Sequence, residues 1–373
     1  MGIRRVLAVF GTRPEAIKLA PVVRELHRRS GHFECRVAVT AQHREMLDQV
    51  LDLFELKPDY DLNIMAAGQT LAQVTVRALQ GLDEVIAAAS PDVVLVQGDT
   101  TTAFCGALAA FYHKVKVGHV ESGLRTGNKF APFPEEVNRR LVTPIADFHF
   151  APTEHAQQCL LREGVPTASI FVTGNTVIDS LLWVRDLVRH MPPGLPDGLV
   201  KSLEGRDVVL ITGHRRESFG DGFENICLAI REIAEAYPQV SFVYPVHLNP
   251  NVREPVNRIL QGHDRVHLIE PLTYAPFVWL MDRSILVLTD SGGVQEEAPS
   301  LGKPVLVMRE TTERPEGVTA GNARLVGVRR ESIVNELHRL LSDPAERASM
   351  AKVRNPYGDG LAAKRIVDVL ESA

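Results

Sequence analysis

The chain has 373 residues, with 41 lysines and arginines against 46 aspartates and glutamates, and a formal net charge of -5. Nucleic acids and anionic membrane surfaces select basic proteins, so this balance argues against both as partners. A chain of this length exceeds what one hydrophobic core organises well, and we therefore expect two domains.

The cysteines and the apolar runs indicate the compartment. Cys35, Cys105, Cys159 and Cys227 are scattered without a C-x-x-C spacing, which favours neither a disulfide framework nor a zinc ribbon and fits a reducing cytoplasm. The amino-terminal apolar stretch breaks at Gly11, and no apolar run approaches membrane-spanning length. We expect a soluble, cytoplasmic protein.

Short β-branched runs alternate with stretches that carry apolar residues at helical spacing, a pattern typical of α/β proteins. In the first half of the chain the expected strands are 6–10, 36–40, 93–97, 115–120, 148–151 and 171–173. After a helical stretch, 176–190, the segment MPPGLPDGL is the richest in proline and glycine and a natural boundary. A second set of expected strands follows at 208–212, 240–246, 266–269, 285–289 and 305–308. Their continuous apolar character predicts parallel sheets buried on both faces.

The loops that follow these strands are unusually polar. They read GTRPE, TAQHRE, GDTTT, HVESGLRTG, GNT, GHRRES, PVHLNP, DSGG and RETTERPE in chain order. A single polar loop is weak evidence, because polar loops commonly cap strands. In open parallel sheets, however, ligands bind outside the carboxyl ends of the strands, so the whole set predicts a ligand site.

These loops, in this order and over nearly the whole chain, closely resemble the non-hydrolysing UDP-N-acetylglucosamine 2-epimerases; FPEEVNRR and NPYGDG extend the match. The resemblance implies an α/β fold of glycosyltransferase-B architecture, with two Rossmann-like domains facing across a cleft. The first domain is expected over 1–178, the UDP-binding domain over 179–360, and a helix in 361–373 crosses back to the first domain. The family interconverts UDP-GlcNAc and UDP-ManNAc, usually as homodimers that supply cell-surface polysaccharide precursors.

The stretch TDSGGVQEEA joins an expected strand to an expected helix. The amides of Ser291, Gly292 and Gly293 can face a diphosphate, because glycine permits close backbone approach. The resemblance implies that Glu297 accepts hydrogen bonds from the ribose hydroxyls. Glu296 receives no role from it, and we expect that side chain to be solvated.

Cations are expected to neutralise the diphosphate. The resemblance places Arg13, Arg314 and His214 there, and a planar guanidinium suits bidentate phosphate contact. Lys18 could add a charge or be solvated. The other substrate-binding residues that the resemblance implies are Asn175, Glu270 and Phe277.

The implied reaction needs acid and base groups, since the proton on C2 of the sugar has no adjacent carbonyl and is not acidic. Elimination of UDP to 2-acetamidoglucal, followed by re-addition on the other face, avoids this difficulty. Asp99, Glu121 and Glu135 are the expected proton carriers, with Arg139 and His214 as further catalytic residues. The residues leave open which carboxylate is acid and which is base. His119 is a weaker candidate for orienting the sugar.

The same loops also bear on other possible chemistries. G-x-G-x-x-G is absent after the first strand, which argues against a nicotinamide enzyme, and the histidines are dispersed without ligand spacing. We therefore expect no cofactor and no metal. A hydrolysing epimerase that releases ManNAc and UDP, and a transferase of the same architecture with a UDP-sugar donor, stay as alternatives. A non-enzymatic nucleotide-sugar sensor ranks low.

Many bacterial members bind a second UDP-GlcNAc as an activator. The residues of this chain that match the effector pocket are Gln42, His43, Arg215, Glu217 and His247. Where those members have Gln and Arg, this chain has Glu45 and Gly68. Loss of a cationic donor and gain of an anion predict weak or absent activation.

Overall fold

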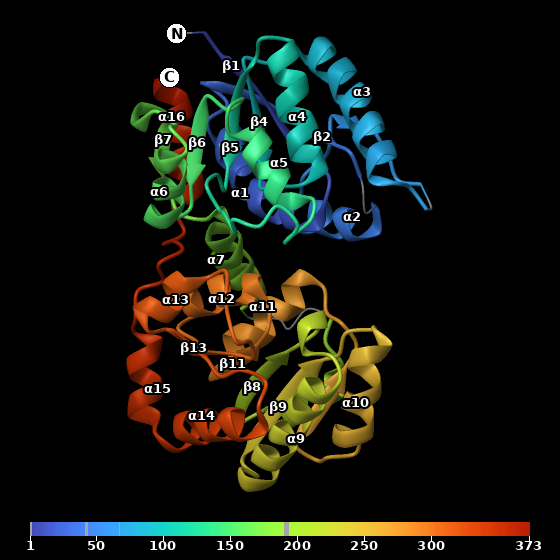
Figure 1. Ribbon diagram of the computed structural model, residues 1–373, viewed down its shortest axis with the longest axis vertical. Coiled ribbons are helices and arrows are strands. Elements are labelled where there is room, and N and C mark those ends of the chain that lie inside the picture. The colour runs from blue at the N-terminus through green and yellow to red at the C-terminus, as the bar shows by residue number, and fades with distance from the viewer. Residues whose placement is uncertain (1, 42–43, 67, 190–193) are drawn as a thin grey trace. The chain divides into compact units, whose positions relative to one another are not determined.

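The computed structural model describes residues 2–41, 44–66, 68–189 and 194–373. The chain divides into two compact units (Figure 1). Unit 1 comprises Met1–Ser180 and Gly358–Ala373, and unit 2 comprises Leu181–Tyr357. Each unit is an α/β structure around one parallel sheet, which confirms the predicted fold class.

Among the described residues, unit 1 contains a seven-stranded parallel sheet of order β3-β2-β1-β4-β5-β6-β7. Val6 of β1 stands opposite Cys35 on one side and Val93 on the other. Every residue of the central strand β4 is buried, as expected for a sheet covered on both faces. The strands are β1 Arg4–Phe10, β2 Phe33–Val39, β3 Tyr60–Asp61, β4 Val93–Gln97, β5 Lys116–Val120, β6 Phe148–Ala151 and β7 Ile170–Val172.

The helices of unit 1 pack side by side on the two faces of this sheet: α3 contacts α4 and α4 contacts α5, whereas α1 contacts α2 and α16 (Figure 1). Threonines begin several of them. Thr70 and Gln73 form a capping box at α3, and Thr100 accepts from the Ala103 amide at α4. The bounds are α1 Arg13–Arg28, α2 Arg44–Leu53, α3 Leu71–Ala89, α4 Thr101–Tyr112, α5 Glu135–Val142, α6 Glu154–Arg162, η1 Thr167–Ser169 and α16 Ala362–Ser372.

The chain leaves unit 1 within helix α7, Thr176–Val188, and returns with α16. The Asp179 carboxylate accepts the amides of Ala362 and Ala363 at 3.2 and 2.9 Å, so it caps the returning helix. Arg29, the residue after α1, pairs with Asp368 and Glu371 of α16. The expected return of the last helix to the first sheet is thereby confirmed. The units divide between residues 180 and 181, earlier than the proline- and glycine-rich segment, part of which lies outside the described residues.

Unit 2 contains, in its described part, a six-stranded parallel sheet of order β10-β9-β8-β11-β12-β13. The strands are β8 Asp207–Thr212, β9 Val240–Pro245, β10 Val266–Ile269, β11 Leu286–Thr289, β12 Val305–Val307 and β13 Ala323–Leu325. The helices are α8 Asp197–Ser202, η2 Arg216–Ser218, α9 Asp221–Ala236, α10 Pro250–Leu260, α11 Tyr274–Arg283, α12 Gly292–Glu297, η3 Ala298–Leu301, α13 Pro315–Ala320, α14 Arg330–Ser342 and α15 Pro344–Ala351.

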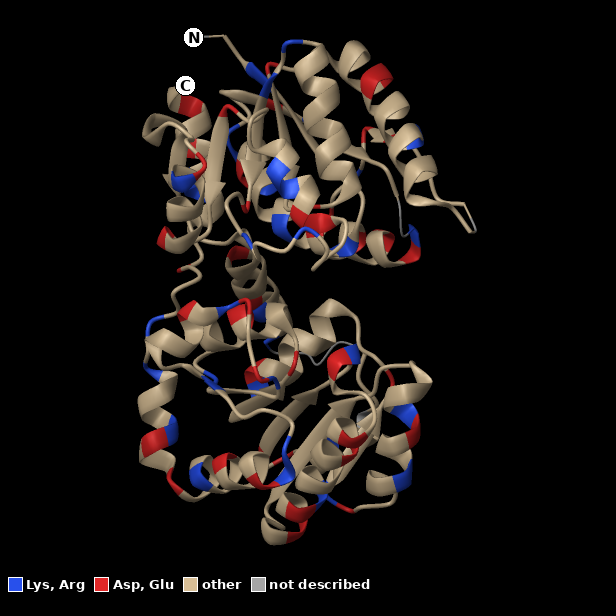
Figure 2. Cartoon of the chain, in the orientation of Figure 1, with Lys and Arg blue, Asp and Glu red and all other residues tan. Residues whose placement is uncertain are grey.

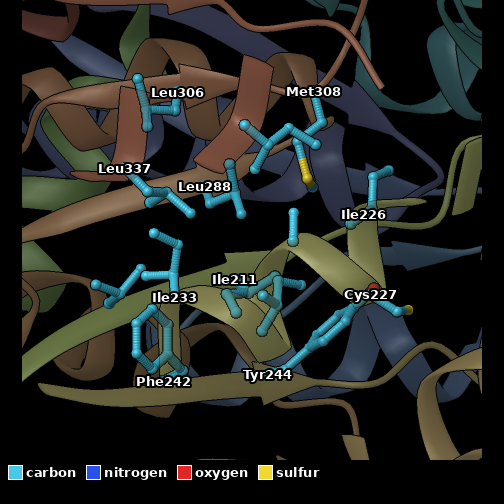
Figure 3. Close-up of a cluster of buried hydrophobic side chains, with 14 of the residues drawn as sticks. Ile211, Ile226, Cys227, Ile233, Phe242, Tyr244, Leu288, Leu306, Met308 and Leu337 are labelled. Atoms are coloured by element: carbon cyan, nitrogen blue, oxygen red, sulfur yellow. The ribbon is translucent and has the colours of Figure 1, made fainter. Parts of the chain in front are cut away.

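The core of unit 2 lies between this sheet and the helices α9, α10 and α14 (Figure 3). Ile211 of β8 and Leu288 of β11 pack against Ile226 of α9 and Leu337 of α14. Burial of such a side chain contributes about 1.5–3 kcal/mol. This core fixes the strands whose carboxyl ends carry the polar loops.

Candidate active site

In unit 1 the carboxylate of Glu121 is the centre of the polar cluster at the strand ends. Its side chain is 7% exposed. Lys18 Nζ of α1 and Gln97 Nε2 of β4 each donate to it at 2.5 Å, and Asn175 Nδ2 donates at 3.0 Å. Residues of α1, β4 and the turn before α7 thus converge on one carboxylate. Lys18 is an ion-pair partner rather than a solvated side chain.

The backbone of Glu121 is strained, because its φ of 65° lies in the left-handed region that side chains rarely adopt. Glu121 directly follows β5. Gly98, which directly follows the neighbouring strand β4, also has a positive φ, of 69°. Such strain costs on the order of 1–3 kcal/mol and is characteristic of functional sites.

The second carboxylate of unit 1, Asp99, forms an ion pair with Arg139 of α5. Arg139 is also held by Glu136, at 3.2 Å, and Glu136 accepts the amides of Thr126 and Gly127. Burial raises the pKa of Glu136, but these hydrogen bonds and Arg139 outweigh it and lower the pKa overall. The fully buried Glu136 therefore anchors both Arg139 and the loop before α5, a role that the sequence did not indicate.

Two further candidate residues of unit 1, Glu135 and His119, differ in their surroundings. Glu135 is the first residue of α5, and its Oε2 is buried without a hydrogen-bond partner among the described residues. His119 is wholly buried, and its Nε2 lies 2.7 Å from the Gly98 carbonyl oxygen. Burial lowers the pKa of His119 to about 3, so the ring is neutral.

The loop after β1 is held by a buried carboxylate that sequence reasoning did not single out. Glu15 accepts from the Gly11 and Thr12 amides at 3.0 and 2.8 Å, and from Thr100 Oγ1 at 2.5 Å. A Cβ at Gly11 would lie 2.1 Å from the Thr40 hydroxyl, so only glycine fits there. Arg13, the first residue of α1, is half-buried and forms no ion pair with any described residue.

In unit 2 the buried carboxylate of Asp290 organises the loop after β8. Its Oδ2 accepts the amides of His214 and Arg215 at 2.7 and 2.8 Å. The His214 ring is 44% exposed and stacks on His247, with ring centroids 5.4 Å apart. The strand ends of β8, β9 and β11 thus meet at one histidine pair.

The turn that begins α12 carries Ser291, Gly292 and Gly293, and its two glutamates are both buried. Glu296 forms an ion pair with Arg314, so the expectation of a solvated Glu296 is wrong: the side chain is 3% exposed because Arg314 neutralises it there. Glu297 accepts from the Tyr274 hydroxyl at 2.7 Å.

A chain of ion pairs joins the loops after β8 and β12. Arg309 donates to Glu217 at 2.6 Å and to Glu313 at 2.5 Å, and Arg215 lies 3.4 Å from Glu313. Arg215 and Glu217, two expected effector residues, are thereby tied to the loop of Arg314. Gln42 and His43 lie outside the described residues, and Glu45 is exposed in the first turn of α2.

The two remaining expected substrate residues lie near strand β10. Glu270 is 71% exposed and pairs with Arg253 at 3.0 Å. It is at the rim of a hollow of about 760 Å³ along β10, which Leu199, Val246 and His267 also line. Phe277 is half-buried on α11. Among the contacts of the described residues, neither Glu270 nor Phe277 is bonded to Asp290 or His214.

The described ranges contain no cluster of three or more His, Cys, Asp or Glu side chains arranged to hold a metal ion. None of their helices is both long and apolar enough to cross a membrane.

Parallel sheets with charged loops at the strand ends are typical of α/β proteins that bind ligands outside those ends. A model of the UDP-N-acetylglucosamine 2-epimerase family matches residues 24–371. The chain belongs to this family, whose members are isomerases.

Individual relatives agree with this assignment over almost the full chain. The UDP-N-acetylglucosamine 2-epimerase of Salmonella typhimurium is 59% identical over 99% of this chain and 98% of its own. The structure of a putative UDP-N-acetylglucosamine 2-epimerase from Listeria monocytogenes has a TM-score of 0.93 at 49% identity, covering 100% of this chain and 96% of that one. The Neisseria meningitidis UDP-GlcNAc 2-epimerase bound to UDP-GlcNAc has a TM-score of 0.88 at 50% identity, covering 99% and 100%.

Proposed function

We propose that this protein interconverts UDP-GlcNAc and UDP-ManNAc by eliminating UDP and adding it back, without release of free sugar. The observation that carries the proposal is the set of three donors on Glu121, beside the pair of Asp99 and Arg139. Relatives bind UDP-GlcNAc, as the Neisseria complex states, and the family membership supports the same substrate here.

In the proposed elimination, a carboxylate of unit 1 accepts the C2 proton while the bond between C1 and the diphosphate oxygen breaks. UDP leaves with that electron pair, and a double bond forms between C1 and C2. A second carboxylate then gives a proton to the opposite face of C2, and the UDP oxygen attacks C1 again. Asp99, Glu121 and Glu135 are the proposed proton carriers, since all three follow strand ends or begin α5.

Paired cations make this chemistry reasonable for Glu121 and Asp99. Lys18 and Arg139 hold the two carboxylates in fixed positions, so little reorganisation is needed when a proton moves. Asn175 Nδ2 shares Glu121 Oε1 with Lys18, and both can turn to sugar hydroxyls.

Unit 2 is proposed to hold the nucleotide. The amides of Ser291, Gly292 and Gly293 approach the diphosphate, and Arg314 and His214 add positive charge or hydrogen bonds there. Glu297 accepts from the ribose in place of the Tyr274 hydroxyl. Arg13 of unit 1 is assigned to the same ligand.

We also propose that the enzyme acts as a homodimer in the cytoplasm and supplies precursors of cell-surface polysaccharides. The resemblance of the loops supports the dimer and the pathway, and the unpaired cysteines fit a reducing compartment. Light scattering of the purified protein should give twice the chain mass; a mass of one chain would exclude the dimer.

Incubation with UDP-GlcNAc in heavy water, followed by proton NMR of the sugar, tests the reaction. Deuterium at C2 of a UDP-linked product is the expected result. Free ManNAc would identify the hydrolysing alternative, and absence of exchange would favour a transferase.

A further inference from the structure

Asp290 is a buried carboxylate that the proposed reaction does not use. It follows β11 directly and is 0% exposed. Only one of its oxygens, Oδ2, is occupied by the His214 and Arg215 amides. These two hydrogen bonds hold the backbone of the loop and do not involve the second oxygen.

That second oxygen, Oδ1, is buried without a hydrogen bond to any residue that the structure describes. A buried polar atom in this condition is costly. The Nδ1 atom of the His214 ring lies 3.5 Å from this oxygen. Hydrogen bonds in ligand-free sites are often this long and shorten when the ligand binds.

The charged surroundings of His214 come from three elements besides its own loop. Asp290 faces it from the end of β11, His247 stacks on it from the end of β9, and Glu313, after β12, faces the neighbouring Arg215. Burial lowers the pKa of His214, Asp290 opposes this effect, and His247 and Arg215 add to it. Without ligand the ring is therefore neutral at pH 7.

We propose that Asp290 is a positioning residue that holds His214 in the Nδ1–H tautomer, so that Nε2 can donate to an anionic ligand only when the ring takes up a proton. Nucleotide-sugar binding is then coupled to uptake of one proton. This rests on the proposed function, which places the diphosphate at His214. The resulting imidazolium lies between two anions, the buried carboxylate and the diphosphate, and faces the oxygen on which charge develops as UDP leaves.

The tautomer can be measured in the unaltered protein. Nitrogen-15 NMR of labelled histidine, with the His214 signal assigned through His214→Gln, distinguishes the two neutral forms of the ring. We expect Nδ1–H without ligand at a pH above the His214 transition. An Nε2–H tautomer would overturn the proposal, whatever the protein does with nucleotides.

Binding of UDP-GlcNAc across a pH series provides the second test, since its diphosphate does not titrate near neutrality. If binding takes up one proton, the affinity for UDP-GlcNAc falls about tenfold for each pH unit above the His214 transition. In Asp290→Asn the amide oxygen can still accept the loop amides, while its NH2 group faces Nδ1 and imposes the Nε2–H tautomer. Neutral His214 then donates to the ligand, and the slope disappears.

Asp179→Asn is the matched control, because Asp179 is also a buried carboxylate that accepts two backbone amides, but it lies in unit 1. It should retain the slope of the wild type. The double variant with Asp290→Asn and His214→Gln should bind UDP-GlcNAc with the same affinity as His214→Gln alone. An unchanged slope in Asp290→Asn, or additive losses, would overturn the proposal. Failure of the wild type to bind UDP-GlcNAc at any pH would instead overturn the proposed function.

Discussion

The loop after β5 in unit 1 and the loop after β12 in unit 2 carry ion pairs of opposite arrangement. In unit 1 a carboxylate is central and is held by donors around it, as Lys18 and Asn175 hold Glu121. In the loop after β12 of unit 2, guanidinium groups are central and are held by carboxylates, as Glu296 holds Arg314. Both signs are otherwise interspersed along the helices of each unit (Figure 2).

This difference indicates that the two units have different roles in the reaction. Fixed carboxylates suit proton transfer to and from carbon, whereas arginines beside a glycine turn suit a diphosphate. The carboxylate partners of Arg314 and Arg215 neutralise these cations before a ligand arrives. We therefore expect substitutions in unit 1 to change rate and substitutions in unit 2 to change affinity.

Glu121→Gln should have the largest effect. Loss of a positioned proton carrier lowers the rate of deuterium incorporation at C2 by about 10²–10⁴-fold. The affinity for UDP, measured by calorimetry, should stay the same because unit 2 holds the nucleotide. Glu84→Gln, an exposed carboxylate on α3, is the control for loss of charge and should leave the rate unchanged. A weaker affinity with a normal rate would reverse the comparison between the units.

Glu15 should make stability depend on pH. Burial raises its pKa from 4.5 to about 7, against the hydrogen bonds from Thr100, Thr12 and Gly11. The folded state thus binds a proton that the unfolded state loses, so stability falls as pH rises from about 4.5 to 7 and is level above that range. The loss amounts to about 3 kcal/mol. Urea unfolding at several pH values measures it.

Glu15→Gln cannot ionise and should remove this fall in stability with pH. The free energy of unfolding could instead rise between pH 4.5 and 7 by the same amount in the wild type and in Glu15→Gln. That result would show that Glu15 is ionised in the folded protein.

Arg314→Ala should weaken UDP binding by about 10- to 100-fold, the usual loss for a charged hydrogen bond. It also removes the ion-pair partner of the buried Glu296 carboxylate, which destabilises unit 2. The double variant with Glu296→Gln separates the two effects, because it should recover the melting temperature and not the affinity. Recovery of affinity in the double variant would mean that Arg314 acts only as a partner for Glu296.

The smallest expected effect concerns the effector. Initial rates from UDP-ManNAc alone should be appreciable, since Glu45 and Gly68 replace the expected Gln and Arg of the pocket. Glu45→Gln removes the added anion and should increase stimulation by UDP-GlcNAc slightly. An absolute requirement for added UDP-GlcNAc in the wild type would contradict this expectation.

The fold was largely predictable because buried parallel strands are continuous apolar runs. The expected strands 93–97, 148–151 and 266–269 match β4, β6 and β10 residue for residue. Two short edge strands were missed. β3 has two residues, one of them Asp61, and Arg324 interrupts the apolar character of β13, so neither produces a run.

The site was predictable only in part. Polar motifs after strands indicated Glu121 and Asp99, because a strand end is visible in the sequence. Their partners were not visible, since Lys18 and Glu121 are 103 positions apart and meet only when β1 and β5 share a sheet. The pairing of Glu296 with Arg314 likewise depends on the loop after β12, and a buried acid looks like a surface acid in sequence.

The central claim is that the bond between C1 and the diphosphate breaks while both fragments stay bound. UDP-GlcNAc labelled with oxygen-18 in the bridge between C1 and phosphorus tests this directly. Once the bond to C1 is broken, the terminal phosphate of the bound UDP can rotate before re-addition. Phosphorus NMR should show the label moving to non-bridging positions at a rate comparable to epimerisation. Epimerisation with the label retained in the bridge would contradict the account.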